Sequence, residues 1–384
     1  MSGRCLASVL PFARIFCALA DMFDLRAEAA HLAARISASD VHQSPFPSGS
    51  NPLARRRSVV IVGGAPDGEM MARRLLQFPE HYEVRGIFDD RVGRLGHLAH
   101  VVPFLGNLDD LLIFCRENLP DIIIISIFSL SQERFRSIFE KIRVIPADIY
   151  LAVQEHGEDK IDGEVLGKSE FSVFLVEKQP LSGWNFFVKF LEDRVLSFLL
   201  LFIFSPLFLI ICILVKCDSR GPILFTQTRY GFNSKPIRVL KFRTMRTEQA
   251  DPSGAKRTVR DDPRVTRVGR YLRRYSFDEL PQLLNVLKGE MSIVAPRAHV
   301  AAMQVDGGLY EDVVKNYLSR HKIKPGITGL AQVKGCRGEV KTLIDAKRRL
   351  CYDLFYINHW SLCLDLKIIL MTVYIVLCKN KNTY

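Results

Sequence analysis

Residues 195–215 form a run of twenty-one uncharged residues, and this run restricts the folds open to the chain. As a straight helix it would reach across the roughly 30 Å hydrocarbon core of a bilayer. A soluble helix without a polar face would be unusual. Ser205 and Pro206 stand at its middle, where proline removes a backbone hydrogen bond and clashes with the preceding turn. We therefore expect a bend there, with the Ser205 hydroxyl available to a freed carbonyl.

The bend leaves two arrangements open. Each arm would contain about ten residues, or roughly 15 Å of helix, which reaches only halfway across the hydrocarbon core. Cations flank both ends, with Lys189 and Arg194 before the run and Lys216 and Arg220 after it. The positive-inside rule therefore gives no asymmetry, as expected if both ends lie on the cytoplasmic side. A re-entrant helical hairpin over residues 186–216 and a kinked span are equally consistent with these features.

The positive charge of the chain is concentrated in one tract. The net charge is +12, and residues 235–274 contain thirteen Lys and Arg against four Asp and Glu, which places +9 in this tract. We expect a basic site for phosphorylated ligands or anionic lipid. Nucleic-acid binding is not favoured, because the tract lacks interleaved aromatic residues. The nine cysteines are scattered without a Cys-x-x-Cys pair, which favours a reducing compartment.

The sequence upstream of the apolar run predicts an α/β domain. A strand over residues 58–62 leads into a glycine-rich turn and a helix over 69–77, and a second strand ends at Asp89. This order is typical of a Rossmann-like βαβ unit. Ala65 replaces the second glycine of the fingerprint and Pro66 removes an N–H, so tight dinucleotide binding is not expected.

The composition also predicts the domain boundaries. We expect, in chain order, an N-terminal extension over residues 1–54, a Rossmann-like α/β domain over 55–155, a linker over 156–185, the hairpin over 186–216 and a small α+β domain over 217–384.

Two adjacent carboxylates, Asp278 and Glu279, follow the basic tract directly. The pattern from Ser276 to Glu279 is a capping box, and apolar residues follow at helical spacing, so the pair could form the acidic first turn of a helix. Alternatively, the two carboxylates could take part in catalysis. A carboxylate at a helix N-terminus among arginines stays ionised, faces a phosphate-binding position and can attack phosphorus. Lys241 and Arg243 share one face of a predicted strand, which indicates either an anion site or a solvated face.

Several motifs occur in the C-terminal half in a fixed order. They are GPILF at 221–225, KFRTM at 241–245, DPRVT at 262–266, LRRYSFDELPQ at 272–282, NVLKGEMS at 285–292, KPGITG at 324–329 and AQV at 331–333. With these motifs, residues 195–384 resemble the bacterial sugar transferase family, the monotopic phosphoglycosyl transferases that initiate synthesis of exopolysaccharide, O-antigen of lipopolysaccharide, or capsule. The α/β unit resembles the soluble domain of the longer members.

The resemblance implies a mechanism. Asp278 would attack the β-phosphorus of a UDP-sugar, expel UMP and carry the sugar phosphate until polyprenyl phosphate accepts it. Glu279 would complete the catalytic pair, with magnesium bound at Asp278 to neutralise phosphate charge. Arg273 and Arg297 would hold phosphate oxygens, and Lys241 and Arg243 are further phosphate-binding candidates.

The resemblance also implies a location and partners. Ser205 and Pro206 would break a re-entrant hairpin, and the catalytic domain would lie on the cytoplasmic side of the bacterial inner membrane. The partners would be a UDP-sugar, polyprenyl (undecaprenyl) phosphate and inner-membrane lipids, without nucleic acid and with a homodimer left open. Longer members usually carry transmembrane helices before the soluble domain, and residues 1–54 show no comparable runs. We therefore expect a natural short form or a truncated one.

One motif departs from the family pattern. This chain has Ala295-Pro296-Arg297-Ala298 where members usually have Gly-Pro-Arg-Pro, so the second proline that would stiffen the loop around Arg297 is missing. The alternative function is therefore a catalytically impaired protein, tethered to the membrane, that senses nucleotides or acts as a scaffold.

Overall fold

The computed structural model describes residues 56–64, 66–91, 102–126, 132–154, 171–246, 262–300, 303–336, 338, 340 and 342–378. The chain divides into two compact units, one formed by residues 37–180 and one that contains residues 181–384. The extension predicted for residues 1–54 lies outside the described residues, as does the part of the basic tract between 247 and 261.

The first unit is built on a six-stranded sheet with the strand order β3-β2-β1-β4-β5-β6. The first five strands are parallel to their neighbours, and β6 is antiparallel to β5. The order of the parallel strands is that of the Rossmann fold. The strands are β1 Arg57–Val62, β2 Tyr82–Phe88, β3 Phe104–Gly106, β4 Ile122–Ile125, β5 Asp148–Gln154 and β6 Phe171–Glu177, and the helices are α3 Pro66–Leu76, α4 Leu108–Glu117 and α5 Gln132–Ile142.

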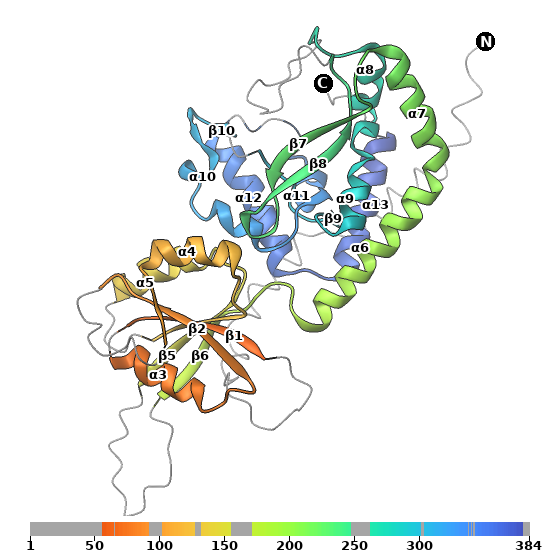
Figure 1. The fold of residues 1–384 in the computed structure, drawn as a ribbon. Coiled ribbons are helices and arrows are strands. Elements are labelled where there is room, and N and C mark those ends of the chain that lie inside the picture. Colours follow the sequence, from red (N-terminus) through yellow and green to blue (C-terminus); the bar gives the residue numbers. More distant parts are fainter. Residues whose placement is uncertain are drawn as a thin grey trace, which may run out of the picture. The chain divides into compact units, whose positions relative to one another are not determined.

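Helices cover both faces of this sheet (Figure 1). Alternate residues of β1 point to opposite faces, so Val59 packs with Met71 of α3 in one core, while Val60 packs with Leu111 of α4 and Ile138 of α5 in the other. The predicted mixed α/β architecture is confirmed. The segment 156–185, predicted as a linker, contains β6, so the sheet continues beyond the predicted boundary at residue 155.

The glycine turn after β1 is closed by the acidic residue that follows β2. The backbone N–H of Gly64 donates to the Asp89 carboxylate at 2.7 Å. In a dinucleotide site a carboxylate at this place would accept the ribose hydroxyl. Gly68 keeps the packing role of the last fingerprint glycine, because a Cβ there would collide with the Gly63 carbonyl. The turn is therefore held by contacts within the protein.

The second unit begins with two apolar helices that meet at a bend. Helix α6 spans Gly183–Ile203 and α7 spans Ser205–Asp218, and the two axes differ by 63° (Figure 1). The Ser205 hydroxyl donates to the Phe202 carbonyl at 2.8 Å, so the predicted bend and its side-chain partner are both confirmed. Among the described helices none is long and apolar enough alone to cross a membrane, but α6 and α7 together form a bent pair of sufficient length and apolarity.

A buried ion cluster attaches α6 to the rest of the unit. Lys189 Nζ lies 2.6 Å from the carboxylate of Asp365 and 3.2 Å from each of those of Glu192 and Asp193. Asp365 belongs to α13, Leu362–Cys378, and also accepts from the Tyr356 hydroxyl at 2.7 Å. Because charges out of water must be paired, this cluster fixes where α6 joins the rest of the second unit.

In the described part of the second unit the remaining elements form a small α+β arrangement that contains three two-stranded sheets. The strands β7 Leu224–Tyr230 and β8 Pro236–Phe242 form an antiparallel ribbon, and β9 Ser292–Val294 pairs in parallel with β12 Gly326–Thr328. Further elements are η3 Phe232–Ser234, α8 Arg267–Arg274, η5 Phe277–Glu279, α9 Gln282–Lys288, β10 Gln304–Val305, β11 Gly308–Leu309, α10 Tyr310–Val313, η6 Tyr317–Lys322, α11 Leu330–Val333 and α12 Leu343–Asn358.

Candidate active site

Asp278 and Glu279 lie in the short 3-10 turn η5, between α8 and α9. Ser276 precedes the turn in the left-handed region with φ of 60°, and its side chain makes no capping hydrogen bond. The predicted capping box is therefore wrong, because the Glu279 carboxylate is bound by other side chains. Helix α9 begins only at Gln282 and is seven residues long, so the expected helix N-terminus does not lie at Asp278.

Glu279 is held by two cations from separate elements. Lys241 of β8 places its Nζ 3.0 Å from Oε1, and Arg297 donates Nη1 to Oε2 at 3.0 Å and contacts Oε1 with Nη2. Burial alone would raise the pKa of Glu279, but the charges of Arg297 and Lys241 outweigh it and hold that pKa below its ordinary value. Glu279 is therefore ionised and largely neutralised.

Asp278 differs from its neighbour, since no hydrogen bond or ion pair joins its carboxylate to another described residue. Burial raises the pKa of Asp278 to about 6; the negative charge of Glu279 adds to the rise, and Lys241, Arg273 and Arg297 oppose it. At neutral pH the carboxylate is mostly ionised. An ionised, partly buried carboxylate without a protein partner is suited to act as a nucleophile.

Arg273 joins this group from α8. Its Nε donates to the Thr244 hydroxyl at 2.8 Å, and its charge lowers the pKa of Asp278. The structure thus brings together Asp278, Glu279, Arg273, Arg297 and Lys241. We call these five residues, with Arg229, the carboxylate cluster.

Arg243 does not join the cluster. Its buried guanidinium donates to the backbone carbonyls of Val215 at 3.2 Å and Ser219 at 2.6 Å, and so closes the C-terminal end of α7. Strand β8 ends at Phe242, so the alternation that predicted a shared face with Lys241 does not extend to Arg243.

Arg229 belongs to the motifs that carry the family resemblance but was not among the predicted site residues, although alternation along β7 places it on the ribbon face of Lys241. Its guanidinium binds the Gln227 amide oxygen and donates Nη1 to the Ala298 carbonyl at 2.6 Å. Burial lowers the pKa of Arg229 to about 10, the charge of Arg297 adds to the effect and Glu279 opposes it. Arg229 therefore adds a positive charge beside the two carboxylates.

Asn285 of α9 positions η5 beside the ribbon. Its Oδ1 accepts from the Leu240 N–H at 3.0 Å and its Nδ2 donates to the Arg238 carbonyl at 2.8 Å. The side chain thereby pairs with the free edge of β8. A single asparagine in a helical pattern gives no sequence signal for this role.

The carboxylates of the cluster, Asp278 and Glu279, are compatible with magnesium binding only when substrate phosphates supply further ligands. In the part of the chain that the structure describes, no group of three His, Cys, Asp or Glu residues could hold a metal ion. Magnesium is commonly bound by one or two carboxylates together with substrate phosphates. Asp278 offers such a carboxylate, whereas the oxygens of Glu279 are already taken by Lys241 and Arg297.

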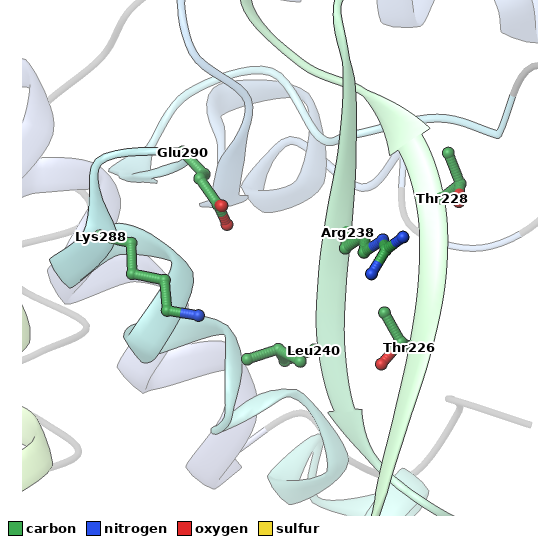
Figure 2. A pocket seen from close by; sticks show the side chains of 6 residues that line it. All are labelled: Thr226, Thr228, Arg238, Leu240, Lys288 and Glu290. Atoms are coloured by element: carbon green, nitrogen blue, oxygen red, sulfur yellow. The ribbon is translucent and has the colours of Figure 1, made fainter.

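A surface cavity of about 480 Å³ lies on the other face of the ribbon. Figure 2 shows Lys288 at the end of α9 and Glu290 in the segment that follows it, facing the ribbon residues Thr226 and Arg238. These strand residues alternate with Gln227 and Lys241, so the cavity is separate from the carboxylate cluster.

Comparison with known proteins places the chain in a family. The model of the bacterial sugar transferase family matches residues 184–379, which contain the whole carboxylate cluster. The chain belongs to the bacterial sugar transferase family. The match confirms the resemblance inferred from the motifs.

Relatives of this bacterial sugar transferase match beyond the family region. The undecaprenyl-phosphate glucose phosphotransferase of Komagataeibacter xylinus is 39% identical over 319 residues, which cover 83% of this chain and 58% of the relative. The UDP-glucose:undecaprenyl-phosphate glucose-1-phosphate transferase of Klebsiella pneumoniae is 36% identical over 327 residues, covering 83% of this chain and 67% of the relative. The chain thus spans about three fifths to two thirds of the length of these two relatives.

Similarity to solved structures is slight. The crystal structure of UDP-D-quinovosamine 4-dehydrogenase from Vibrio fischeri covers 25% of this chain and 78% of its own, with 15% identity and a TM-score of 0.23, and it carries no argument about function.

Proposed function

We propose that this bacterial sugar transferase moves a hexose 1-phosphate from a UDP-sugar to polyprenyl phosphate and releases UMP, as the first step of surface polysaccharide synthesis. The observation that carries the proposal is an ionised Asp278 without a hydrogen-bond or ion-pair partner among the described residues, beside a Glu279 that two cations already neutralise. The names of the relatives make UDP-glucose the first donor to test.

In the first step Asp278 Oδ attacks the β-phosphorus of the UDP-sugar. A carboxylate–phosphorus bond forms, the bond to the bridging oxygen breaks, and UMP leaves with the electron pair. Arg297 and Arg273 bind the phosphate oxygens on which negative charge builds up; hydrogen bonds to charged groups are typically worth about 1.5–3 kcal/mol each. Glu279 keeps Arg297 and Lys241 in place before substrate arrives.

In the second step an oxygen of polyprenyl phosphate attacks the same phosphorus. The carboxylate–phosphorus bond breaks, Asp278 regains its negative charge, and the product is a polyprenyl diphosphate sugar. Asp278 would hold magnesium together with substrate phosphates, and the metal would supply charge that offsets theirs. The four cations of the cluster outnumber its two carboxylates, which favours a dianionic ligand over a neutral one.

We further propose that α6 and α7 enter the cytoplasmic leaflet of the bacterial inner membrane as a re-entrant hairpin, so that a lipid phosphate can reach Asp278. The exposed apolar side chains of the pair support this proposal, since an apolar surface of this extent is unusual on a soluble protein. They include Phe198, Phe202, Ile203, Leu209, Ile210 and Ile213. The cations at both flanks, Arg194 and Lys216, are consistent with both ends lying on one side.

Transfer of radiolabelled glucose phosphate from UDP-glucose into a lipid extract tests the proposal. We expect incorporation with wild-type membranes and none with Asp278→Asn, a substitution that keeps the shape and removes the nucleophile. A panel of UDP-hexoses read out by UMP release would identify the donor. No transfer from any of them, or undiminished transfer by Asp278→Asn, would contradict the enzymatic function and favour the scaffold alternative.

A further inference from the structure

The surface cavity on the other face of the ribbon is lined mainly by polar side chains. Its volume of about 480 Å³ falls within the range of roughly 300–1,000 Å³ that is usual for small-molecule sites. Thr226 and Thr228 are alternate residues of β7 on this face, and Arg238 of β8 lies opposite Thr228. Lys288 and Glu290 line the facing wall and extend towards the ribbon (Figure 2). The proposed reaction uses none of these side chains.

Arg238 and Lys288 bring two positive charges to the cavity without a matching anion. No hydrogen bond or ion pair joins either side-chain cation to another described residue. The one carboxylate of the lining, that of Glu290, is bound instead by the Asn285 amide, whose Nδ2 donates to Oε2 at 2.6 Å. Two like charges beside one space attract an anion into it. The cavity therefore suits an anionic ligand.

Asn285 fixes the wall that carries Glu290. Its side chain is buried, and the same Nδ2 also donates to the Arg238 backbone carbonyl at 2.8 Å. Glu290 Oε1 forms no hydrogen bond to another described residue, so it stays available to a ligand. A carboxylate oxygen repels a bare anion but accepts hydrogen bonds from hydroxyl groups. The preferred ligand therefore carries hydroxyls as well as negative charge.

The six lining residues restrict the ligand further. None of them is aromatic, so a nucleobase would find no ring on which to stack. The exposed hydroxyls of Thr226 and Thr228 can both donate and accept. Guanidinium and ammonium groups fit phosphate oxygens, whereas a carboxylate and two threonines fit sugar hydroxyls. A sugar phosphate satisfies this set of side chains better than a nucleotide or a bare anion.

We propose that this cavity is a second ligand site, which binds a hexose phosphate. Arg238 and Lys288 bind the phosphate oxygens, and Glu290 and the two threonines bind the sugar hydroxyls. The site lies outside the carboxylate cluster, because its β8 residues alternate with Lys241. An occupant would contact both elements that Asn285 joins, β8 and the end of α9, and so would stiffen the strand that carries Lys241.

Equilibrium binding of radiolabelled glucose 1-phosphate to the detergent-solubilised full chain tests the proposal. We expect saturable binding to the wild type. Arg238→Gln and Lys288→Gln should each weaken it by at least about fivefold, since each removes a charged contact at an exposed position. The matched control is Arg297→Gln, which removes a guanidinium from the carboxylate cluster and should leave this affinity unchanged. Weaker binding in Arg297→Gln with unchanged binding in Arg238→Gln would place the ligand at the carboxylate cluster and overturn the proposal.

Glu290→Gln distinguishes a sugar phosphate from a bare anion. In the wild type, inorganic phosphate should displace the label only at higher concentrations than glucose 1-phosphate. Glu290→Gln removes a charge that repels phosphate and replaces a charged hydrogen-bond acceptor by a neutral one, so the preference for glucose 1-phosphate should fall by at least about fivefold. Equal displacement by inorganic phosphate in the wild type, or an unchanged preference in Glu290→Gln, would overturn the assignment of a sugar.

Hydrogen–deuterium exchange supplies a second readout. Glucose 1-phosphate should slow exchange in the peptide that contains residues 236–242 of the wild type and leave it unchanged in Arg238→Gln. These measurements do not depend on transfer activity, so the two proposals fail separately. An active wild type without saturable binding would overturn the second site alone, and a wild type that shows this binding pattern without transfer would overturn the proposed function alone.

Discussion

The pH dependence of the first chemical step follows from the environment of Asp278. With a pKa of about 6, about half of the nucleophile is ionised at pH 6. That fraction rises to about nine tenths at pH 7 and falls to about one tenth at pH 5. Since only the anion attacks phosphorus, the single-turnover rate of UMP release at UDP-sugar concentrations well below saturation, which reports the ionisation of the free enzyme, should fall about tenfold from pH 7.5 to pH 5. Rapid-quench measurement in the absence of polyprenyl phosphate isolates this step.

Glu279→Gln supplies the directional test of the same argument. The negative charge of Glu279 raises the pKa of Asp278, and Lys241 and Arg297 lower it. Glu279→Gln removes the charge that raises this pKa and leaves both cations, so the midpoint of the acid limb should move below that of the wild type even though the enzyme is slower. A wild-type midpoint near the ordinary Asp value of about 3.9, or an upward shift in Glu279→Gln, would refute the reasoning.

Three further predictions concern stability and the bent helix pair. The pKa of Asp278 is raised from 3.8 to about 6, so the ionised carboxylate disfavours folding above pH 6. Asp278→Asn removes this charge and should raise the free energy of unfolding at pH 8 by about 2–3 kcal/mol. In urea titrations this gain should disappear near pH 4, where Asp278 is protonated in the wild type. Lys189→Met leaves three buried carboxylates without their cation and should cost about 3–5 kcal/mol in the same titrations, whereas exposed Lys288→Met should cost little. Pro206→Leu should straighten the bend of 63°, so that the end of α7 with Cys217 crosses to the other side of the membrane. In a variant whose only cysteine is Cys217, a thiol reagent added on the cytoplasmic side of membrane vesicles should then no longer label it. Unchanged labelling would argue against a proline-dependent hairpin.

Much of the fold was predictable because it depends on local patterns. The parallel strands of the first unit are continuous apolar runs, such as Ile122–Ile125, and such runs are typical of sheets buried on both faces. The bend at Pro206 follows from proline stereochemistry alone. Strand β6 was missed because it lies at the sheet edge and is antiparallel to β5, so it does not continue the βαβ order from which the other strands were predicted.

The candidate site was predictable only in its residue types. The motifs named Asp278, Glu279 and Arg297, but not that Glu279 would be the partnered carboxylate, because its cations come from positions 18 and 38 residues away. Lys189 illustrates the same limit. Its neighbours Glu192 and Asp193 lie at helical spacing in the sequence, while Asp365, 176 residues away, is brought there only by packing of α13.

The central claim, a covalent intermediate on Asp278, is tested most directly by mass spectrometry of the acid-quenched enzyme. After incubation with UDP-glucose and magnesium without polyprenyl phosphate, the peptide containing Asp278 should gain one hexose phosphate, in proportion to the UMP released. The adduct should disappear when polyprenyl phosphate is added and should not form in Asp278→Asn. Transfer of sugar phosphate to lipid without any adduct, or an adduct that persists in Asp278→Asn, would contradict the account.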